Sequence, residues 1–228
     1  MIEIVNISFS YLNSDRKILD HLDGKFERGH LYSIMGSSGT GKTTLLRLVS
    51  GILAPQEGMI RIDGENVDGS AIRKNRMAYI SQDYLLFPYM NAIDNLVIAM
   101  DIFFPDRSRE ENKEEAKRIL LKVGISGEEQ KRRTENLSGG EKQRIAIARA
   151  LALKANYILA DEPTGNLDSQ NAEIIIKHLK EIASKQNACI LLVTHSRETA
   201  DKADVVYEMK EEKLQIIRDE KDDQESMV

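Results

Sequence analysis

The residues best suited to reactive chemistry form one glycine-rich stretch. Residues 36–43 read GSSGTGKT and fit the pattern GxxxxGK followed by Ser or Thr, in which main-chain N–H groups surround phosphate oxygens. Glycines let the backbone wrap a phosphate, Lys42 can reach the β- and γ-phosphates, and the Thr43 hydroxyl can ligate Mg²⁺. The stretch therefore predicts a site for a nucleoside triphosphate with Mg²⁺. Its expected contacts are Gly36, Ser37, Ser38, Gly39, Thr40, Gly41, Lys42, Thr43 and Thr44.

Two adjacent acids, Asp161 and Glu162, follow the apolar run 157–160. A strand that ends this way beside a phosphate loop can present carboxylates to a metal–nucleotide complex. Successive side chains of an extended chain diverge, so the two acids should have different roles. We expect Asp161 to hold Mg²⁺, directly or through water, and Glu162 to orient or deprotonate the attacking water. The alternative is that both acids only cap the following segment.

The elements that must position these residues follow an alternating pattern. Apolar runs bounded by turn or polar residues predict strands at 31–35, 77–80, 157–160, 190–193 and 205–207. Helical patterns lie between them, which favours an α/β fold with a mostly parallel sheet. The glycine-rich stretch lies between the apolar run 30–35 and the helical pattern 44–53, and these flanks disfavour a plain glycine turn.

The strand signal disappears between about residues 84 and 154. Helical patterns at 94–103, 109–123 and 139–153 replace it, which predicts a helical subdomain inserted in the core. The last ten residues, 219–228, are acidic and nearly without apolar side chains until the final two. We expect them to form a solvated tail, so that residues 1–218 form one domain.

Composition limits the classes of function. The 228 residues are 41% hydrophobic and 30% charged, which is typical of a folded globular chain. The net charge of −5 provides no overall basic field, so nucleic acid is not an expected partner. Cys189 is the only cysteine and is expected to fill core. No signal peptide and no apolar window of about 18 residues is present, so we expect a cytosolic chain that does not span a membrane.

The stretch 137–144, LSGGEKQR, resembles the LSGGQ-type signature of the ABC ATPases. Ser138 can cap a helix that begins near Gly139, and Gly139 and Gly140 permit close approach of phosphate to a positively polarised helix end. In the family this second anion site serves the γ-phosphate of ATP held by the opposite subunit. The resemblance therefore implies a homodimer, formed on ATP binding, that encloses two nucleotides head to tail.

Other family positions occur in order, and the resemblance spans residues 1 to about 217. Tyr11 matches the aromatic residue that stacks on adenine. Gln82 matches the glutamine that touches Mg²⁺ or the attacking water. Residues 165–168, which end at Asp168, match the loop that crosses the dimer interface, and His195 matches the histidine that contacts the γ-phosphate. The implied catalytic residues are Glu162, His195, Lys42 and Gln82, and the implied metal contacts are Thr43, Gln82 and Asp161.

The resemblance implies an ABC ATPase fold, in which a P-loop, RecA-like core with N-terminal antiparallel strands carries an inserted helical subdomain. It implies an ATP-hydrolysing subunit on the cytoplasmic face of the cell membrane that powers a separate permease. Residues 161–168, DEPTGNLD, look most like the cassettes of lipoprotein release, macrolide or antimicrobial-peptide export, and cell division. Ser81 departs from the aromatic residue usual there. The alternative is a soluble ABC ATPase, such as one for iron–sulfur cluster assembly.

Directly after Gln82 comes an unusually apolar stretch, residues 83–90. In transporters of this family the neighbouring groove receives a coupling helix of the membrane subunit, so these side chains could face a partner. The alternative is that Leu85, Phe87 and Met90 fasten the helical subdomain to the core. Both interpretations can hold for different residues of the stretch.

Overall fold

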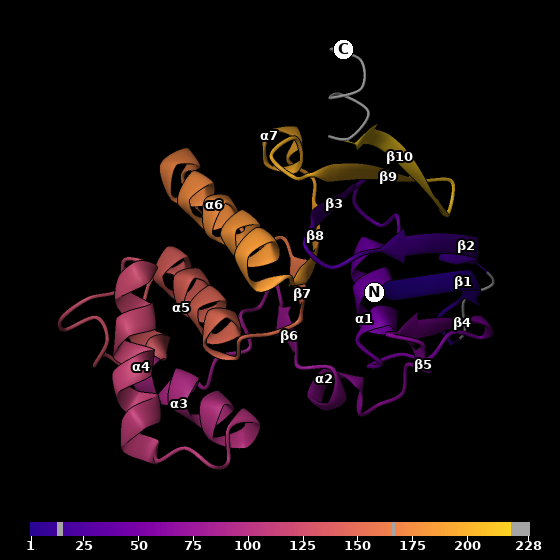
Figure 1. Cartoon of the computed structure of the whole chain (residues 1–228). Helices are drawn as coiled ribbons and strands as arrows, with labels where there is room; N and C mark the ends of the chain where they lie inside the picture. The colour runs from indigo at the N-terminus through magenta and orange to yellow at the C-terminus, as the bar shows by residue number, and fades with distance from the viewer. Residues whose placement is uncertain (13–15, 166, 220–228) are drawn as a thin grey trace.

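The strands of the protein form two sheets. The structure, a computed structural model, describes residues 1–12, 16–165 and 167–219 (Figure 1). The four-stranded sheet is antiparallel and has the order β2 (Leu19–Phe26), β1 (Ile2–Phe9), β4 (Glu57–Ile62) and β5 (Glu65–Asn66). The six-stranded sheet has the order β10 (Lys213–Asp219), β9 (Val205–Lys210), β3 (Leu31–Met35), β8 (Cys189–Thr194), β7 (Tyr157–Asp161) and β6 (Met77–Ile80).

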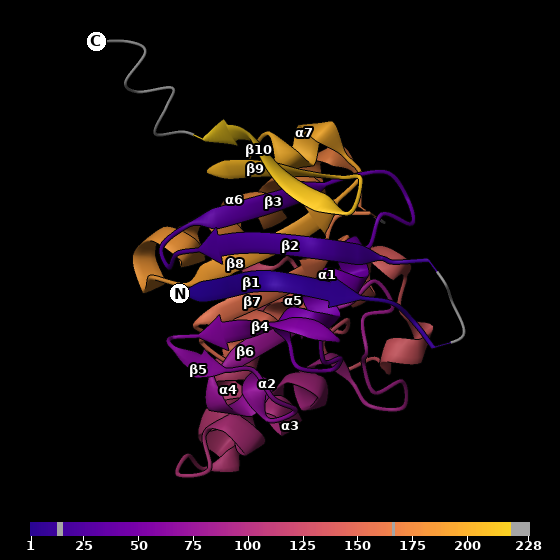
Figure 2. The same cartoon turned by 90° about the vertical axis from the view of Figure 1, so that its right-hand side faces the viewer.

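The larger sheet is parallel except for β10, which runs antiparallel to β9. Figure 2 shows the antiparallel sheet as a separate layer in front of the parallel strands. The helices are α1 (Lys42–Val49), α2 (Ala71–Lys74), α3 (Ala92–Phe103), α4 (Arg109–Lys122), α5 (Gly139–Ala152), α6 (Ser169–Gln186) and α7 (Arg197–Ala200), with a 3₁₀ turn at Thr134–Asn136. Among the helices of these described ranges, none combines the length and the apolarity needed to cross a bilayer.

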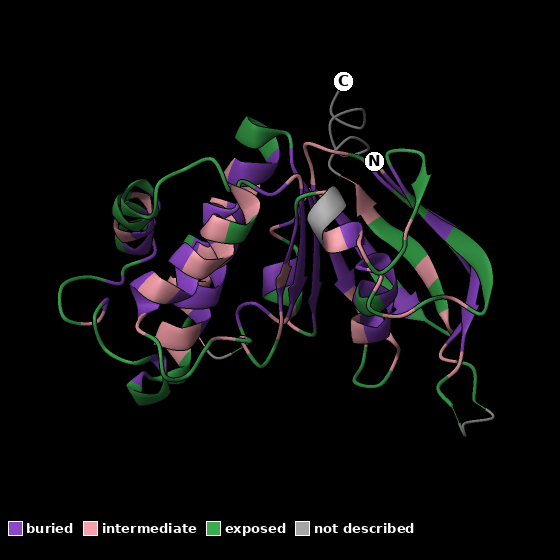
Figure 3. Ribbon diagram, turned by 90° about the horizontal axis from the view of Figure 1, so that it is seen from below, coloured by how far each residue is buried: buried purple, intermediate pink, exposed green. Residues whose placement is uncertain are grey.

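Alternating side chains on the parallel strands divide the core into two parts. On β8, Leu191 and Val193 pack with α1 and the antiparallel sheet, whereas Ile190 and Leu192 pack with the helices on the other face. This period of two is the signature of an extended chain, and here both faces are covered. The central strands are accordingly buried throughout (Figure 3). Such burial holds the carboxyl ends of these strands in fixed positions.

Helices α3, α4 and α5 pack together at one side of the molecule, away from the antiparallel sheet (Figure 1). Each has a side-chain cap at its N-terminus: Asn91 accepts from the main-chain N–H of Asp94, and Ser108 and Ser138 each form a complete capping box with a glutamate three residues on. Such caps satisfy N–H groups that the helix leaves unpaired. These helices lie in the region where the sequence predicts an inserted helical subdomain.

The predicted α/β fold is confirmed, with two differences in detail. The helix after the glycine-rich stretch was predicted to reach residue 53, but α1 ends at Val49. Gly51 adopts a left-handed φ of 76°, where a side chain would collide with the main-chain oxygen of Asp68, so the chain must turn there. Asp219, which was assigned to the tail, is the last residue of β10. The rest of the predicted tail, residues 220–228, lies outside the described residues.

Candidate active site

The glycine-rich stretch forms a loop between β3 and α1. Gly39 and Gly41 have φ values of 81° and 100°, a region that other residues rarely adopt. A Cβ atom at Gly36 would lie 2.8 Å from the main-chain oxygen of Met209, so this position also requires glycine. Gly41 precedes α1 without providing a side-chain cap, which leaves the first N–H groups of the helix available to an anion. The loop is therefore built to bind phosphate.

The Lys42 ammonium lies against this loop. Its Nζ atom donates hydrogen bonds to the main-chain oxygens of Gly36, at 2.7 Å, and Ser37, at 2.8 Å. Burial lowers the pKa of Lys42, and the carboxylates of Glu162 and Asp161 oppose that shift. Thr40 also donates to the Ser37 oxygen, at 3.0 Å, which holds the loop in its curved shape. The loop thus places a buried positive charge where phosphate would bind.

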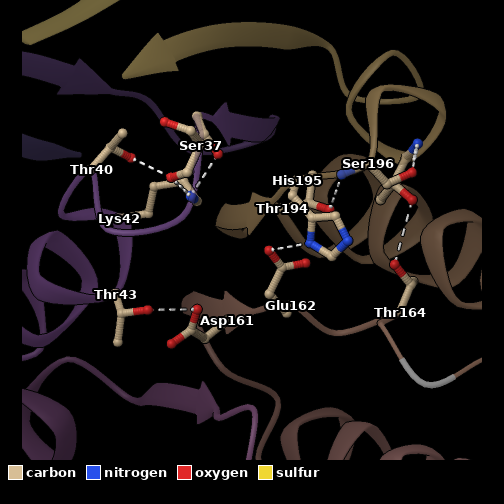
Figure 4. Close-up of polar contacts among 12 residues, drawn as sticks. Ser37, Thr40, Lys42, Thr43, Asp161, Glu162, Thr164, Thr194, His195 and Ser196 are labelled. Carbon is tan, nitrogen blue, oxygen red and sulfur yellow. Dashed lines mark hydrogen bonds and ion pairs between the residues drawn. The ribbon is translucent and has the colours of Figure 1, made fainter. Parts of the chain in front are cut away.

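Asp161 ends β7 and faces the loop. The Thr43 hydroxyl donates to its Oδ1 atom at 3.1 Å (Figure 4), and the carboxyl is 4% exposed. Within the described ranges, no three His, Cys, Asp or Glu side chains form a metal cluster. One carboxylate beside one hydroxyl nevertheless fits Mg²⁺, which proteins often hold through one or two carboxylates together with substrate phosphates. Thr43 and Asp161 are the residues that would hold it.

Burial raises the pKa of Asp161, and the Thr43 hydrogen bond only partly offsets this effect. Because its pKa in the fold lies above that in the unfolded chain, ionisation of Asp161 destabilises the fold. The penalty is absent below the unfolded pKa, grows through the interval between the two values and is complete above the folded pKa. We therefore expect Asp161→Asn to raise the Tm of the nucleotide-free protein at pH 7.

Thermal unfolding followed from acid to neutral pH would check this, with the advantage of Asp161→Asn vanishing at acid pH. Asp168→Asn is the matched control, because hydrogen bonds from Asn171 lower the pKa of Asp168 and asparagine can still cap α6. That variant should lose stability at neutral pH. A Tm of Asp161→Asn at or below that of the wild type at pH 7 would contradict the assigned penalty.

Glu162 follows β7 directly and forms a pair with His195, which follows β8. The Oε1 atom of Glu162 lies 2.9 Å from Nδ1 of His195, and Figure 4 shows the carboxylate turned toward the ring. Glu162 is a non-glycine residue in the left-handed region, with a φ of 51°. Such strain is concentrated at functional sites, where the surrounding structure must hold it. Behind the ring, the main-chain N–H of Ser196 donates to Thr194 and so shapes the turn that carries His195.

These residues surround a cavity of about 460 Å³. It collects most of the site residues predicted from the sequence: Tyr11, Ser38, Gly39, Gly41, Lys42, Thr43, Thr44, Gln82, Asp161, Glu162 and His195. Gly36, Ser37 and Thr40 support the loop from outside this lining. Tyr11 is 39% exposed and its hydroxyl lies 3.1 Å from Oγ1 of Thr44, so its ring stands at the rim beside α1.

Sequence reasoning missed Ile18, which also lines the cavity. A Cβ atom at Gly41 would lie 2.9 Å from the Cγ2 atom of Ile18, so this side chain closes the loop from the side. No local signal marks Ile18, since it is one apolar residue directly before β2. A larger cavity of about 650 Å³ lies beside α6. It is a poorer candidate for a phosphate site, because Lys180 in its lining already pairs with Asp204 at 3.0 Å and the glycine-rich loop does not reach it.

Four further predicted site residues lie outside the 460 Å³ cavity and do not belong to the phosphate loop. Ser138, Gly139 and Gly140 form the start of α5, where Ser138 and Gly139 are exposed. Asp168 caps α6, because its Oδ1 atom accepts from the main-chain N–H of Asn171 at 3.0 Å. One copy of the chain therefore brings together the phosphate loop, the two acids and the histidine, but not the signature residues.

A glycine loop at the carboxyl end of a parallel strand, with a buried carboxylate facing it, defines a P-loop nucleotide-hydrolysing protein. The family model described as ABC transporter matches residues 19–165, and the chain belongs to this family. It is an ATP-binding and ATP-hydrolysing subunit of an ABC transporter.

The chain is 37% identical, over 90% of its length and 91% of the relative's, to the uncharacterized ABC transporter ATP-binding protein YclH of Bacillus subtilis (strain 168). It is 33% identical, over 95% of its length and 93% of the relative's, to the lipoprotein-releasing system ATP-binding protein LolD of Shewanella frigidimarina (strain NCIMB 400). Its fold matches the dimeric structure of MJ0796, a bacterial ABC transporter cassette, with a TM-score of 0.88 and 29% identity, covering 96% of this chain and 99% of that one. A post-hydrolysis MJ0796 dimer with bound ADP and Pi matches equally well.

Proposed function

We propose that this chain hydrolyses ATP through the residues that line the 460 Å³ cavity. The observation that carries the proposal is the Glu162–His195 pair, which lies in the same cavity as Lys42 and the Thr43–Asp161 pair. Lys42 and the N–H groups of the loop would bind the β- and γ-phosphates, while Tyr11 would stack on the adenine ring. When bound by Thr43, Asp161 and Gln82, Mg²⁺ would neutralise phosphate charge.

Glu162 is the residue that would orient the attacking water and accept its proton. The hydrogen bond to His195 restrains its carboxylate, and the exposed ring of His195 is free to reach the γ-phosphate from the other side. Phosphoryl transfer depends on positioning and charge neutralisation more than on covalent help from the protein. The arrangement of Glu162, His195 and Lys42 supplies both.

The site would be completed by a second copy of the chain. Ser138, Gly139 and Gly140 lie outside the chain's own cavity, at the start of α5, so they are placed to contact a nucleotide held by a partner. The N–H groups and the positive end of a helix dipole favour a phosphate there. Asp168 would lie at the same interface. ATP binding would thus close the homodimer, and loss of the γ-phosphate would weaken it.

We assign the docking of a membrane permease to the exposed side chains of residues 85–90. The side chains of Leu85, Phe87, Tyr89 and Met90 are 63%, 49%, 75% and 36% exposed. Tyr84 and Leu86 instead pack against the core of the helical region. The alternative interpretation, in which Leu85, Phe87 and Met90 fasten the helical region to the core, is therefore wrong for these three side chains, and Tyr84 and Leu86 pack there instead.

Several contacts hold this stretch in one shape. Arg149 of α5 donates to the main-chain oxygens of Leu85, at 2.5 Å, and Tyr84, at 3.1 Å. Asn95 donates to the oxygen of Phe87 and accepts from its N–H. A backbone already ordered before docking reduces the entropy that binding must overcome. The exposed apolar side chains therefore form a rigid surface rather than a loose loop.

A double variant tests this surface. Leu85→Glu with Phe87→Glu places two charges in the proposed interface, so it should abolish co-purification of a multi-span membrane protein from detergent extracts. ATP hydrolysis by the purified chain should stay within about twofold, since neither side chain lines the cavity. Leu121→Glu, on α4 and 57% exposed, is the matched control and should still co-purify the partner. Retention of the partner by the double variant would place the docking surface elsewhere.

The transporter is proposed to be of the export or membrane-extraction type, with this subunit on the cytoplasmic face of the membrane. The supporting observation is how much of each relative aligns with this chain. The alignment with LolD covers 93% of that protein, whereas the alignment with the Fe(3+) ions import protein FbpC of Pasteurella multocida (strain Pm70), at 38% identity and over 80% of this chain, covers only 52% of the relative. Similarity to LolD therefore extends over nearly all of that protein.

Purification from the native host would test the transporter assignment as a whole. A tagged Glu162→Gln chain, solubilised in mild detergent with ATP and Mg²⁺, should hold the closed complex longest and carry the permease with it. Recovery of a stoichiometric multi-span membrane protein would support the proposal and identify the partner. Recovery of only soluble partners would favour an iron–sulfur assembly ATPase, a class that none of the relatives named above supports.

A further inference from the structure

Gln143 connects the signature helix to the proposed catalytic glutamate. It lies on α5 and is 3% exposed, and its Nε2 atom donates a hydrogen bond of 3.1 Å to the main-chain oxygen of Glu162. This contact joins two elements, α5 and the turn after β7, that are 19 residues apart. It acts on the backbone of Glu162, whereas His195 acts on the carboxylate.

The backbone of Glu162 needs such support. Its left-handed φ of 51° is a strained conformation for a residue with a side chain. Besides the Gln143 contact, the main-chain N–H of Glu162 donates to Val193 of β8 at 3.0 Å, and its oxygen accepts from the N–H of Gly165 at 3.2 Å. The first of these contacts is with the sheet, and the second lies within the turn itself. Gln143 is thus the one contact in this group that comes from the helical region.

The other end of the Gln143 amide argues against a purely structural role. Its Oε1 atom is buried and has no hydrogen-bond partner within the part of the chain that the structure describes. An unpaired buried polar atom destabilises a fold, so an apolar side chain would suit this position better for stability alone. The single bond to Glu162 is what a glutamine provides here and an apolar residue does not.

The position of Gln143 on α5 gives this bond a second consequence. Ser138 caps the same helix, five residues earlier, which is about 7.5 Å along the axis. If α5 moves as a rigid body at Ser138, Gln143 must move with it. Any shift of α5 that accompanies contact between Ser138 and a partner's phosphate would therefore reach the backbone of Glu162.

We propose that Gln143 is a positioning residue that links the signature end of α5 to Glu162. Through it, the ATP held by the partner and contacted by Ser138 helps to set the carboxylate that acts on the chain's own ATP. The two nucleotide sites of the dimer are thereby coupled through one side-chain hydrogen bond. This inference rests on the proposed roles of Glu162 and of the residues at the start of α5.

Gln143→Met tests the link, because methionine keeps the approximate volume and removes both the donor and the unpaired oxygen. In steady-state assays of the purified full-length chain, kcat should fall roughly five- to tenfold, the loss of about one hydrogen bond in the transition state. The Kd for ATP should stay within about twofold and the Tm should not fall. The proposed coupling predicts a Hill coefficient for ATP above one in the wild type, and this coefficient should move toward one in the variant.

Gln130→Met is the matched control. Gln130 is also buried, and its Nε2 atom donates to the main-chain oxygens of Ile125, at 2.9 Å, and Lys117, at 3.3 Å, neither of which belongs to the catalytic turn. Loss of these bonds should lower the Tm while leaving kcat and the Hill coefficient of the folded protein unchanged. A buried glutamine with only a structural role would behave in this way at position 143 as well.

The outcomes separate this inference from the proposed function. A wild-type kcat and Hill coefficient in Gln143→Met, or a Hill coefficient of one in the wild-type chain, would overturn the link while leaving the roles of Glu162 and Ser138 intact. Normal turnover in Glu162→Gln would instead refute the proposed function, and the link with it. A fall in kcat with a retained Tm and an unchanged response of Gln130→Met would support the coupling.

Discussion

Glu162→Gln should bind ATP with near-normal affinity but hydrolyse it about 10²- to 10⁴-fold more slowly, which is the usual contribution of a general base. Glutamine keeps the shape of the side chain and can still contact Nδ1 of His195, so the turn after β7 should keep its geometry. It cannot accept a proton from water. Phosphate release under saturating ATP and Mg²⁺ measures the loss, and equilibrium binding of ATP measures the retained affinity.

The same variant should accumulate as an ATP-bound dimer. Hydrolysis is the event that releases the partner in the proposed cycle, so a slow enzyme should elute as a dimer with ATP and as a smaller species with ADP. Glu198→Gln is the matched control: Glu198 lies on α7, 71% exposed, and contacts Lys202 at 3.5 Å. It should hydrolyse ATP normally and show no trapped dimer. Near-normal turnover in Glu162→Gln would remove Glu162 from the role of base.

Lys42→Met is expected to lose ATP binding itself. Truncating a buried, hydrogen-bonded charge that faces an opposite charge on the ligand reduces the binding free energy by about 2–5 kcal/mol. This corresponds to a rise in the Kd for ATP of at least about 30-fold. In the absence of nucleotide the variant should be as stable as the wild type or more stable, because burial already lowers the pKa of Lys42 and thus penalises its charge. Loss of affinity and retained stability would then occur together.

Thermal unfolding with and without ATP and Mg²⁺ separates these two effects. A ligand at 100 times its Kd stabilises the fold by about 2.7 kcal/mol, so the wild type should gain several degrees in Tm and Lys42→Met almost none. Lys25→Met is the matched control, since Lys25 is 59% exposed on β2 and lies 3.4 Å from Glu27. Its response to ATP should equal that of the wild type. An equal response in Lys42→Met would exclude the ammonium from phosphate binding.

Much of the fold could be predicted because its signals are local. The parallel strands follow from short apolar runs. The helical patterns at 94–103, 109–123 and 139–153 lie within two residues of the ends of α3, α4 and α5, and the predicted cap at Ser138 is confirmed. The end of α1 could not be predicted in this way. It depends on the approach of Asp68 to Gly51, a contact between segments that the helical pattern does not connect.

The candidate site likewise contains residues that local patterns predict and residues that only long-range contacts bring to it. The phosphate loop, the paired acids and the signature could be predicted from the sequence, because each is a short run whose residue types carry the chemistry. Three features emerge only from the three-dimensional packing: Ile18 closes the loop, Tyr84 and Leu86 pack inward while Leu85 and Phe87 are exposed, and Gln143 supports Glu162. These contacts join distant segments. They depend on how helices and sheets pack in three dimensions, which no local pattern of residue types encodes.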